Sequence, residues 1–372
     1  MKRIAFFLLL LFCVFHVGQA ESLDAGIEKT LEQVDIGALE AASCQGDLRE
    51  LIIHLAKGET VWDGAQAGRA LGEALLGELR GSFSRIMGLI APALLCALAG
   101  SLQPRNPGVS QMAENACFLV LAACLAADMR VFLAEAEQAV THMAELMQTL
   151  FPMLLTLLAA VGATSGAALF KPAVSAASGT MTALVQRVSL PLAMGVATVS
   201  LLDHLSPETR LSRLASLLRE AAAWTLGIAF TVFIGVTALQ GLTAAAADGI
   251  GIRAAKYAVD NLVPVVGGMF ADTMDTLVGC AMLIKNALGV TGLFLLLSVA
   301  GLPMLRLLIA ALCYRLCAAL LQPAAPSRAS GMIQSFSDVL MLLFVIELSV
   351  GAMFILLVAQ MLAVGNLAVG LR

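Results

Sequence analysis

The sequence has little charge and few aromatic side chains. Asp, Glu, Lys and Arg make up 13% of its 372 residues, and Phe, Trp and Tyr make up 5%, whereas about 25% of the residues of a soluble domain are charged. Hydrophobic residues reach 60% and the mean hydropathy is +0.91, so the composition excludes a water-soluble globular protein and a disordered chain. A formal net charge of -4 provides no basic surface field, so no nucleic-acid partner is expected.

Familiar catalytic patterns are also missing. The segment 162–166 lacks the G-x-S-x-G frame of a nucleophilic serine, and no P-loop for nucleotide binding occurs. An intramembrane aspartyl protease needs acids on two facing helices, but Asp272 and Asp275 are three residues apart and share one helix face. We therefore expect no enzymatic activity, no cofactor and no metal site.

The apolar residues that are present favour membrane-spanning helices. They are dominated by Ala and Leu, which are strong helix formers, and lipid-facing strands would need more aromatic residues at the interfaces. We predict an all-α, polytopic integral membrane protein with six to nine membrane segments. The 288–322 stretch contains Pro303 and Arg306 and is expected to be one bent helix or two short ones. The apolar segments lie near residues 86–103, 116–134, 150–170, 181–202, 224–247, 262–284, 288–312 and 337–364.

The first twenty residues have the pattern of a secretory signal peptide. Lys2 and Arg3 precede an apolar run over 4–17, and Gly18 and Ala20 provide a small-x-small cleavage site. The run would be about 21 Å long as a helix, which is short for a hydrocarbon core of about 30 Å. We predict cleavage after Ala20; the alternative is a retained first membrane helix.

Cleavage would place an acidic region, residues 21–80, outside the cytoplasm and leave 81–372 as a multi-spanning membrane domain. Residues 21–85 contain 12 of the 26 acidic residues and 6 of the 22 basic ones. Leucines at helical spacing, such as Leu71, Leu75 and Leu79, predict amphipathic helices. This region is expected to be either a docking domain or a solvated spacer.

The sidedness of residues 203–223 cannot be derived from the charge pattern. If 150–170 and 181–202 both span, Arg210, Arg213 and Arg219 lie outside, against the positive-inside rule. Either one segment is re-entrant or these arginines belong to a helix that docks a partner or anionic lipid. An interfacial linker is the third interpretation.

Small residues and charges mark two further regions. Gly162 and Gly166 form a GxxxG pair, the spacing at which membrane helices approach closely. Pro264, followed by Gly267 and Gly268, is expected to interrupt a helix, and these two glycines are further candidates for helix packing. Asp272 would then fall in the first turn of the next half-helix.

The segment 247–293 carries charges close to membrane depth, where ionisable groups are costly and are candidates for function. We predict that they line a polar path or form a subunit contact; the alternative is a helix start stabilised by its dipole, with a local balance of Asp and Lys. The candidates are Asp248, Arg253, Lys256, Asp260, Asp272, Asp275 and Lys285.

A family resemblance rests on the same region. Residues 247–293 read ADGIGIRAAKYAVDNLVPVVGGMFADTMDTLVGCAMLIKNALGVTGL, and this run resembles stage III sporulation protein AE of endospore-forming bacteria. Further agreement comes from LFPMLLTLLAAVGATSGAALFKP at 150–172, from LREAAAWTLGIAFTVFIGV at 218–236 and from the stretch 303–323. The resemblance covers about residues 80–372.

The resemblance implies a role in sporulation rather than a reaction. It implies a subunit in the mother-cell membrane around the forespore, in a secretion-like channel that acts as a feeding conduit and allows late forespore gene expression. The implied partners are the other stage III sporulation A-operon proteins (ATPase-like, ring-forming and small membrane subunits), the lipid bilayer and, indirectly, a forespore membrane protein. The alternative from the residues alone is an autonomous ion-coupled secondary transporter.

Overall fold

A computed structural model describes residues 64–101, 107–205, 211–262, 267–323 and 327–370, and all the regular structure in these ranges is helical. Residues 1–63, which contain the predicted signal peptide and most of the predicted acidic region, lie outside the described residues. The elements are α5 (Gly64–Ser101), α6 (Pro107–Ala160), α7 (Thr164–Leu184), a π-helical turn η1 (Val185–Ser189), α8 (Leu190–Leu205), α9 (Ser212–Leu262), α10 (Gly267–Leu321) and α11 (Ser327–Gly370).

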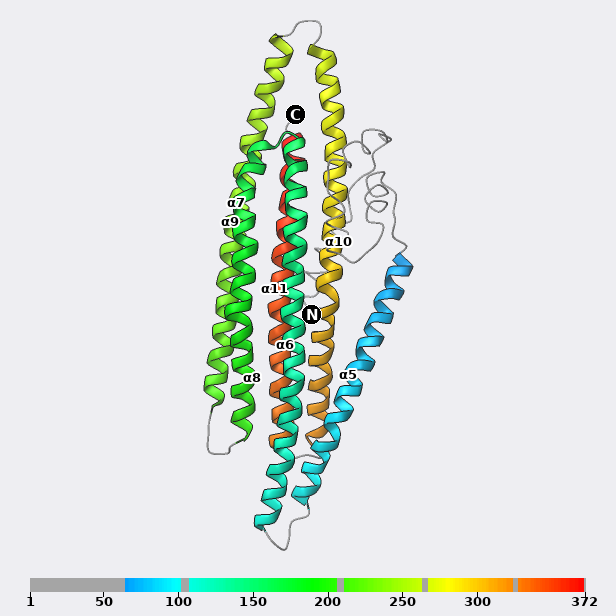
Figure 1. Cartoon of the computed structure of the whole chain (residues 1–372), viewed down its shortest axis with the longest axis vertical. Helices are drawn as coiled ribbons and strands as arrows, with labels where there is room; N and C mark the ends of the chain where they lie inside the picture. The colour runs from blue at the N-terminus through cyan, green and yellow to red at the C-terminus, as the bar shows by residue number, and fades with distance from the viewer. Residues whose placement is uncertain (1–63, 102–106, 206–210, 263–266, 324–326, 371–372) are drawn as a thin grey trace.

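The helices form one elongated bundle around α11 (Figure 1). Helix α11 packs against α10, α9, α6 and α8, and α5 packs against α6 and α10 at the opposite edge from α7, α8 and α9. At one end, α9 and α10 extend beyond the other helices. The core of the bundle contains a group of three aromatic rings, in which Tyr314 lies 4.8 Å from Phe336 and 6.4 Å from Phe132 between ring centroids.

Five of the helical segments in the described part of the chain are long and apolar enough to cross a membrane. They support a multi-pass membrane protein, and the predicted number of six to nine stays a prediction. The segments are Asn115–Ala160, Gly179–His204, Ser212–Gly241, Val278–Leu321 and Arg328–Val364.

The helices are longer than the predicted apolar segments, because charged residues between the segments do not end them. Helix α6 continues through Glu135, Glu137 and Glu145, since glutamate is a good helix former. Helix α10 likewise joins the predicted segments 262–284 and 288–312 and continues past Pro303. Of the two expectations for 288–322, the structure therefore has the single helix.

Gly162 forms a turn between α6 and α7. Its φ is 94°, in the left-handed region that favours glycine. Its N–H donates to the carbonyl of Ala159 at 3.0 Å, and the next N–H, of Ala163, donates to Leu158 at 3.2 Å, which is the Schellman pattern at a helix end. Gly162 therefore follows the end of α6 while Gly166 lies in α7, so the two glycines do not share one helix, and their role in helix packing stays a prediction.

Candidate functional site

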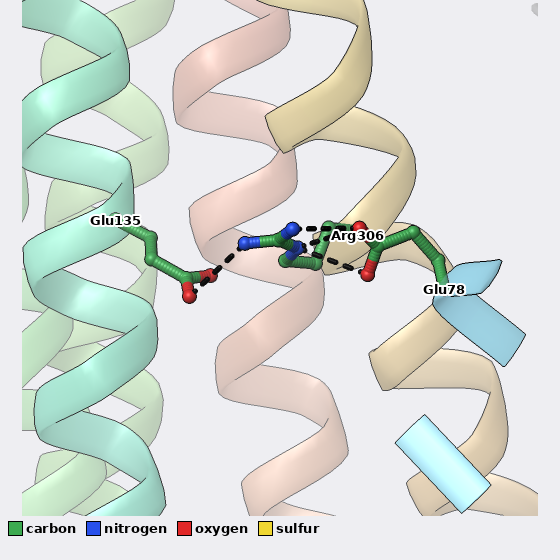
Figure 2. Close-up of polar contacts among 3 residues, drawn as sticks. All are labelled: Glu78, Glu135 and Arg306. Atoms are coloured by element: carbon green, nitrogen blue, oxygen red, sulfur yellow. Dashed lines mark hydrogen bonds and ion pairs between the residues drawn. The ribbon is translucent and has the colours of Figure 1, made fainter. Parts of the chain in front are cut away.

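Three charged side chains from three helices meet between α5, α6 and α10 (Figure 2). Arg306 of α10 donates from Nε to both carboxylate oxygens of Glu78 at 2.9 Å and from a terminal nitrogen to the same carboxylate at 2.7 Å. Its other terminal nitrogen donates to Glu135 of α6 at 3.2 Å. We call Glu78, Glu135 and Arg306 the Arg306 cluster; with both glutamates ionised, its net charge is negative.

The planar guanidinium makes this arrangement possible. Its donors point in fixed directions, so one side can bind a carboxylate at two points while the other side reaches a second acid. In Figure 2 the Arg306 side chain lies between Glu135 and Glu78. The cluster therefore joins α5 to both α6 and α10, and its arginine lies within the candidate span Val278–Leu321.

The Arg306 cluster is partly open to the outside of the bundle. The Arg306 side chain is 41% exposed, and those of Glu78 and Glu135 are 23% and 26% exposed. Charges in contact with hydrocarbon are costly, and charged residues in membrane segments ordinarily face a bundle interior, a water-filled space or each other. A partly open cluster in an apolar helix is therefore a candidate contact point for water or for another subunit.

A fourth ionisable group, Glu347 of α11, interacts electrostatically with Glu135 of the Arg306 cluster. Glu347 is 1% exposed. Neither of its carboxylate oxygens has a hydrogen-bond partner among the described residues. Glu78, Glu135 and Arg306 are paired with one another, whereas Glu347 has no such hydrogen-bonded partner among the described residues.

A second polar contact holds α6 to α10. The Tyr314 hydroxyl, in a fully buried side chain, donates to Asp128 at 2.6 Å. Arg85 of α5 lies over the ring of Phe132, with its guanidinium carbon 5.0 Å from the ring centroid, a favourable cation–π position. In addition to the Arg306 cluster, the Tyr314–Asp128 hydrogen bond thus joins α10 to α6, and the Arg85–Phe132 contact joins α5 to α6.

The predicted charged region is divided between two helices. Asp248, Arg253, Lys256 and Asp260 belong to the end of α9, and Asp272 and Asp275 to the beginning of α10; the surroundings of their side chains, and those of Gly267 and Gly268, lie outside the described part of the structure. Helix α9 ends at Leu262 and α10 begins at Gly267, and Pro264, at the predicted interruption, lies outside the described residues. The first turn of α10 contains no acidic residue, so the expected position of Asp272 in that turn is wrong.

Lys285 is the predicted candidate that the structure places in the core. Its side chain is 1% exposed, and Nζ donates to the backbone carbonyl of Leu362 in α11 at 3.0 Å. One turn further along α10, Gly289 faces the side chain of the same residue, Leu362. Lys285 therefore helps to hold α10 against α11 within this chain; its proposed place in a polar path stays a prediction.

The three arginines of the predicted docking helix lie in different settings. Arg210 lies outside the described residues, and Arg213 is exposed near the start of α9. Arg219 is partly exposed, and a terminal guanidinium nitrogen lies 3.7 Å from a carboxylate oxygen of Asp338 in α11. The docking helix proposed for these three arginines stays a prediction.

Reasoning from the sequence did not identify Glu78, Glu135 or Glu347 as site residues, and noted Arg306 only beside Pro303. The missing information was spatial, because the partners of Arg306 are far away in the sequence and belong to different helices. A usable signal was present for Arg306 and Glu347, since each places a charge inside an apolar run. No group of three His, Cys, Asp or Glu side chains suited to a metal ion occurs in the ranges that the structure describes.

Comparison with known proteins supports one family. The model of the family described as stage III sporulation protein AE matches residues 46–365. The stage III sporulation protein AE of Bacillus subtilis (strain 168) is 30% identical over 340 residues, which are 91% of this chain and 84% of that protein. No solved structure matches the chain significantly. The chain therefore belongs to the stage III sporulation protein AE family.

Proposed function

We propose that this sporulation protein is a membrane subunit of a secretion-like channel complex that links the mother cell and the forespore. It lies in the mother-cell membrane around the forespore and contributes to a feeding conduit needed for forespore development and late forespore gene expression. The observation that carries the proposal is family membership across residues 46–365, and the absence of a catalytic arrangement in the sequence agrees with a structural role.

The Arg306 cluster suggests how a subunit of this kind contacts a neighbour. Its guanidinium and two carboxylates are partly exposed, and exposed apolar side chains such as Leu76, Phe83 and Leu119 lie on the same helices α5 and α6. Such a polar point in an apolar surface gives a neighbouring membrane subunit a specific register, because an unpaired charge would be left if the subunit docked elsewhere.

An affinity pull-down from gently solubilised membranes of sporulating cells at engulfment tests the role. We expect the tagged chain to recover the ATPase-like and ring-forming proteins of the same operon, and an untagged chain to recover none. Recovery of the chain alone, in a detergent in which these companions still hold each other, would contradict membership of the complex.

An autonomous ion-coupled secondary transporter is the second candidate, and the buried Glu347 carboxyl favours it, because acidic groups inside membrane bundles serve as ion and proton sites in transporters. Reconstitution of the purified chain alone in vesicles with an ion gradient separates the two functions. Gradient-driven uptake without any partner would support the transporter, whereas a subunit of a complex is inert under these conditions.

A further inference from the structure

Arg187 occupies an unusual position for a basic residue. It is exposed at the centre of the π-helical turn η1, roughly 12 Å inside the nearer end of the candidate span Gly179–His204. Among the described residues, its guanidinium has no ion pair or hydrogen bond. A π turn within an α-helix commonly marks a functional position. Because a charge in contact with hydrocarbon is costly, we expect an acid from outside the bundle to pair with this arginine.

The Arg306 cluster has the opposite imbalance of charge. Two carboxylates share its single guanidinium, so one negative charge is left over at a partly exposed position. The sharing is unequal, because Glu78 accepts from Nε and from a terminal nitrogen, whereas Glu135 accepts one donor at 3.2 Å. Glu135 is therefore the member of the cluster that is most available to a second basic group.

Other arginines of the same helices do not supply the missing positive charge. Arg80 lies about 200° around α5 from the glutamate of the cluster on that helix, and Arg130 lies about 140° around α6 from its glutamate. Arg85 lies over the ring of Phe132, which is one turn of α6 from Asp128. That arginine thus has an acid at its own level of the bundle.

Arg187 and the Arg306 cluster lie at nearly the same depth in the bundle. Gln186, the neighbour of Arg187 in η1, donates to Thr141 of α6 at 3.0 Å, and Thr141 is about 9 Å along α6 from Glu135. Copies of a membrane protein that share one orientation are related by rotation about the membrane normal, so each residue keeps its depth. The arginine of one copy therefore lies at the depth of the cluster in the next.

The two groups lie on different surfaces of the bundle. The turn η1 packs against α7, α8 and α9, whereas α5 packs against α6 and α10, and Figure 1 shows α5 at the opposite side from α7, α8 and α9. Both surfaces carry exposed apolar side chains near the charges, with Leu76 and Phe83 on α5, and Val188 and Met194 beside Arg187. The two surfaces can therefore exclude water around a charged centre.

We propose that this chain forms a head-to-tail homo-oligomer in the membrane, in which Arg187 of one copy binds Glu135 in the Arg306 cluster of the next copy. The second guanidinium neutralises the spare negative charge, and both charged groups leave the hydrocarbon. Because the two surfaces differ, association continues from copy to copy until a ring closes. The inference rests on the subunit contact proposed above, for which it names the neighbour, and it requires none of the other operon proteins.

Self-association of the purified full-length protein tests the interface, measured by light scattering in mixed micelles of a mild detergent and phosphatidylcholine. We expect the wild type to form oligomers and Arg187→Glu to self-associate at least about thirtyfold more weakly, because it places another acid at the contact. The matched control is Lys171→Glu, which reverses an exposed charge of α7 outside the candidate span and should associate normally. Circular dichroism checks that each variant is helical, and Arg187→Gln removes the charge with a smaller disturbance.

A mixing experiment tests the head-to-tail arrangement. Glu135→Gln removes the spare charge of the cluster and should weaken self-association, whereas Glu137→Gln, an exposed position on another face of α6, should not. Each defective chain keeps one intact surface, since Glu135→Gln retains the arginine and Arg187→Glu retains the cluster. A mixture of these two chains should therefore form pairs with one copy of each and nothing larger.

Four results would overturn the proposal. The first is a wild-type protein that stays monomeric, which would leave the cluster to a different subunit. The second is normal self-association of Arg187→Glu, Arg187→Gln or Glu135→Gln. The third is a mixture that forms no pairs or assembles beyond them. The fourth is wild-type association that occurs only when phosphatidylglycerol is added, which would assign Arg187 to a lipid phosphate. Because only the purified chain is used, each of these results is distinct from failure of the pull-down.

Discussion

The contact between Gly289 and Leu362 gives a sharp test of how α10 and α11 pack. A Cβ added at Gly289 would lie 2.8 Å from Leu362 Cγ and 2.9 Å from Cδ1, with Cδ2 closer still. Because the branching Cγ is involved as well as the methyl tips, a simple rotation of the leucine end does not relieve the overlap. Gly289→Ala must therefore change the leucine rotamer or separate the helices, at a cost of about 1–3 kcal/mol.

The control for this substitution lies on the same helix. A Cβ at Gly301 would have no atom within 4 Å, so Gly301→Ala gains only the helix propensity of alanine, up to about 1 kcal/mol. Both variants share that gain, and we expect Gly289→Ala to be less stable than Gly301→Ala by about 1–3 kcal/mol. Reversible unfolding in mixed micelles, followed by circular dichroism, measures the difference.

A double-mutant cycle with Leu362→Ala identifies the cause of the loss. Removing the leucine side chain removes the overlap, so the cost of Gly289→Ala should fall by about 1–3 kcal/mol in that background. The reasoning is refuted if Gly289→Ala is as stable as Gly301→Ala, or if its effect and that of Leu362→Ala add to within about 0.5 kcal/mol.

Two further predictions concern the polar contacts of α10. Tyr314→Phe keeps the aromatic packing but removes the donor to Asp128, so a cycle with Asp128→Asn should give a coupling of about 1.5–3 kcal/mol; additive effects would show that this hydrogen bond contributes nothing. Arg306→Ala leaves two carboxylates without their shared donor and, because the site is partly exposed, should cost about 1–2 kcal/mol. The exposed Arg315→Ala should change stability by less than about 0.5 kcal/mol, and equal losses in the two arginine variants would contradict a specific role for Arg306.

The sequence allowed the helical, membrane-type architecture to be predicted, because apolar composition and helix propensity are local properties. The bounds of α9 and α10, at Leu262 and Gly267, lie on either side of Pro264, where the sequence predicts a helix interruption. The lengths of the helices were not predicted. Charged residues between apolar segments, such as the glutamates of α6, were expected to separate helices, but the helix continues through them.

The site was harder to predict for a different reason. Arg306 binds Glu78 and Glu135, whose positions relative to α10 follow from the packing of three helices and not from any spacing in the sequence. The charges of 247–293 attracted attention because they are close together, whereas a buried residue such as Glu347 is isolated in its apolar run. Isolation of a single charge was the more informative pattern.

The extension of α9 and α10 beyond the other helices has a mechanical consequence. As a helix of 55 residues, α10 measures about 82 Å, whereas even a helix tilted by about 40° crosses a 30 Å hydrocarbon core within about 40 Å. The helix is thus longer than one crossing requires, and residues 242–262 of α9 and 267–277 of α10 lie beyond both candidate spans. Since α10 runs as one helix from Gly267 through Arg306, a displacement of its first residues is transmitted along the helix towards the Arg306 cluster without an intervening loop.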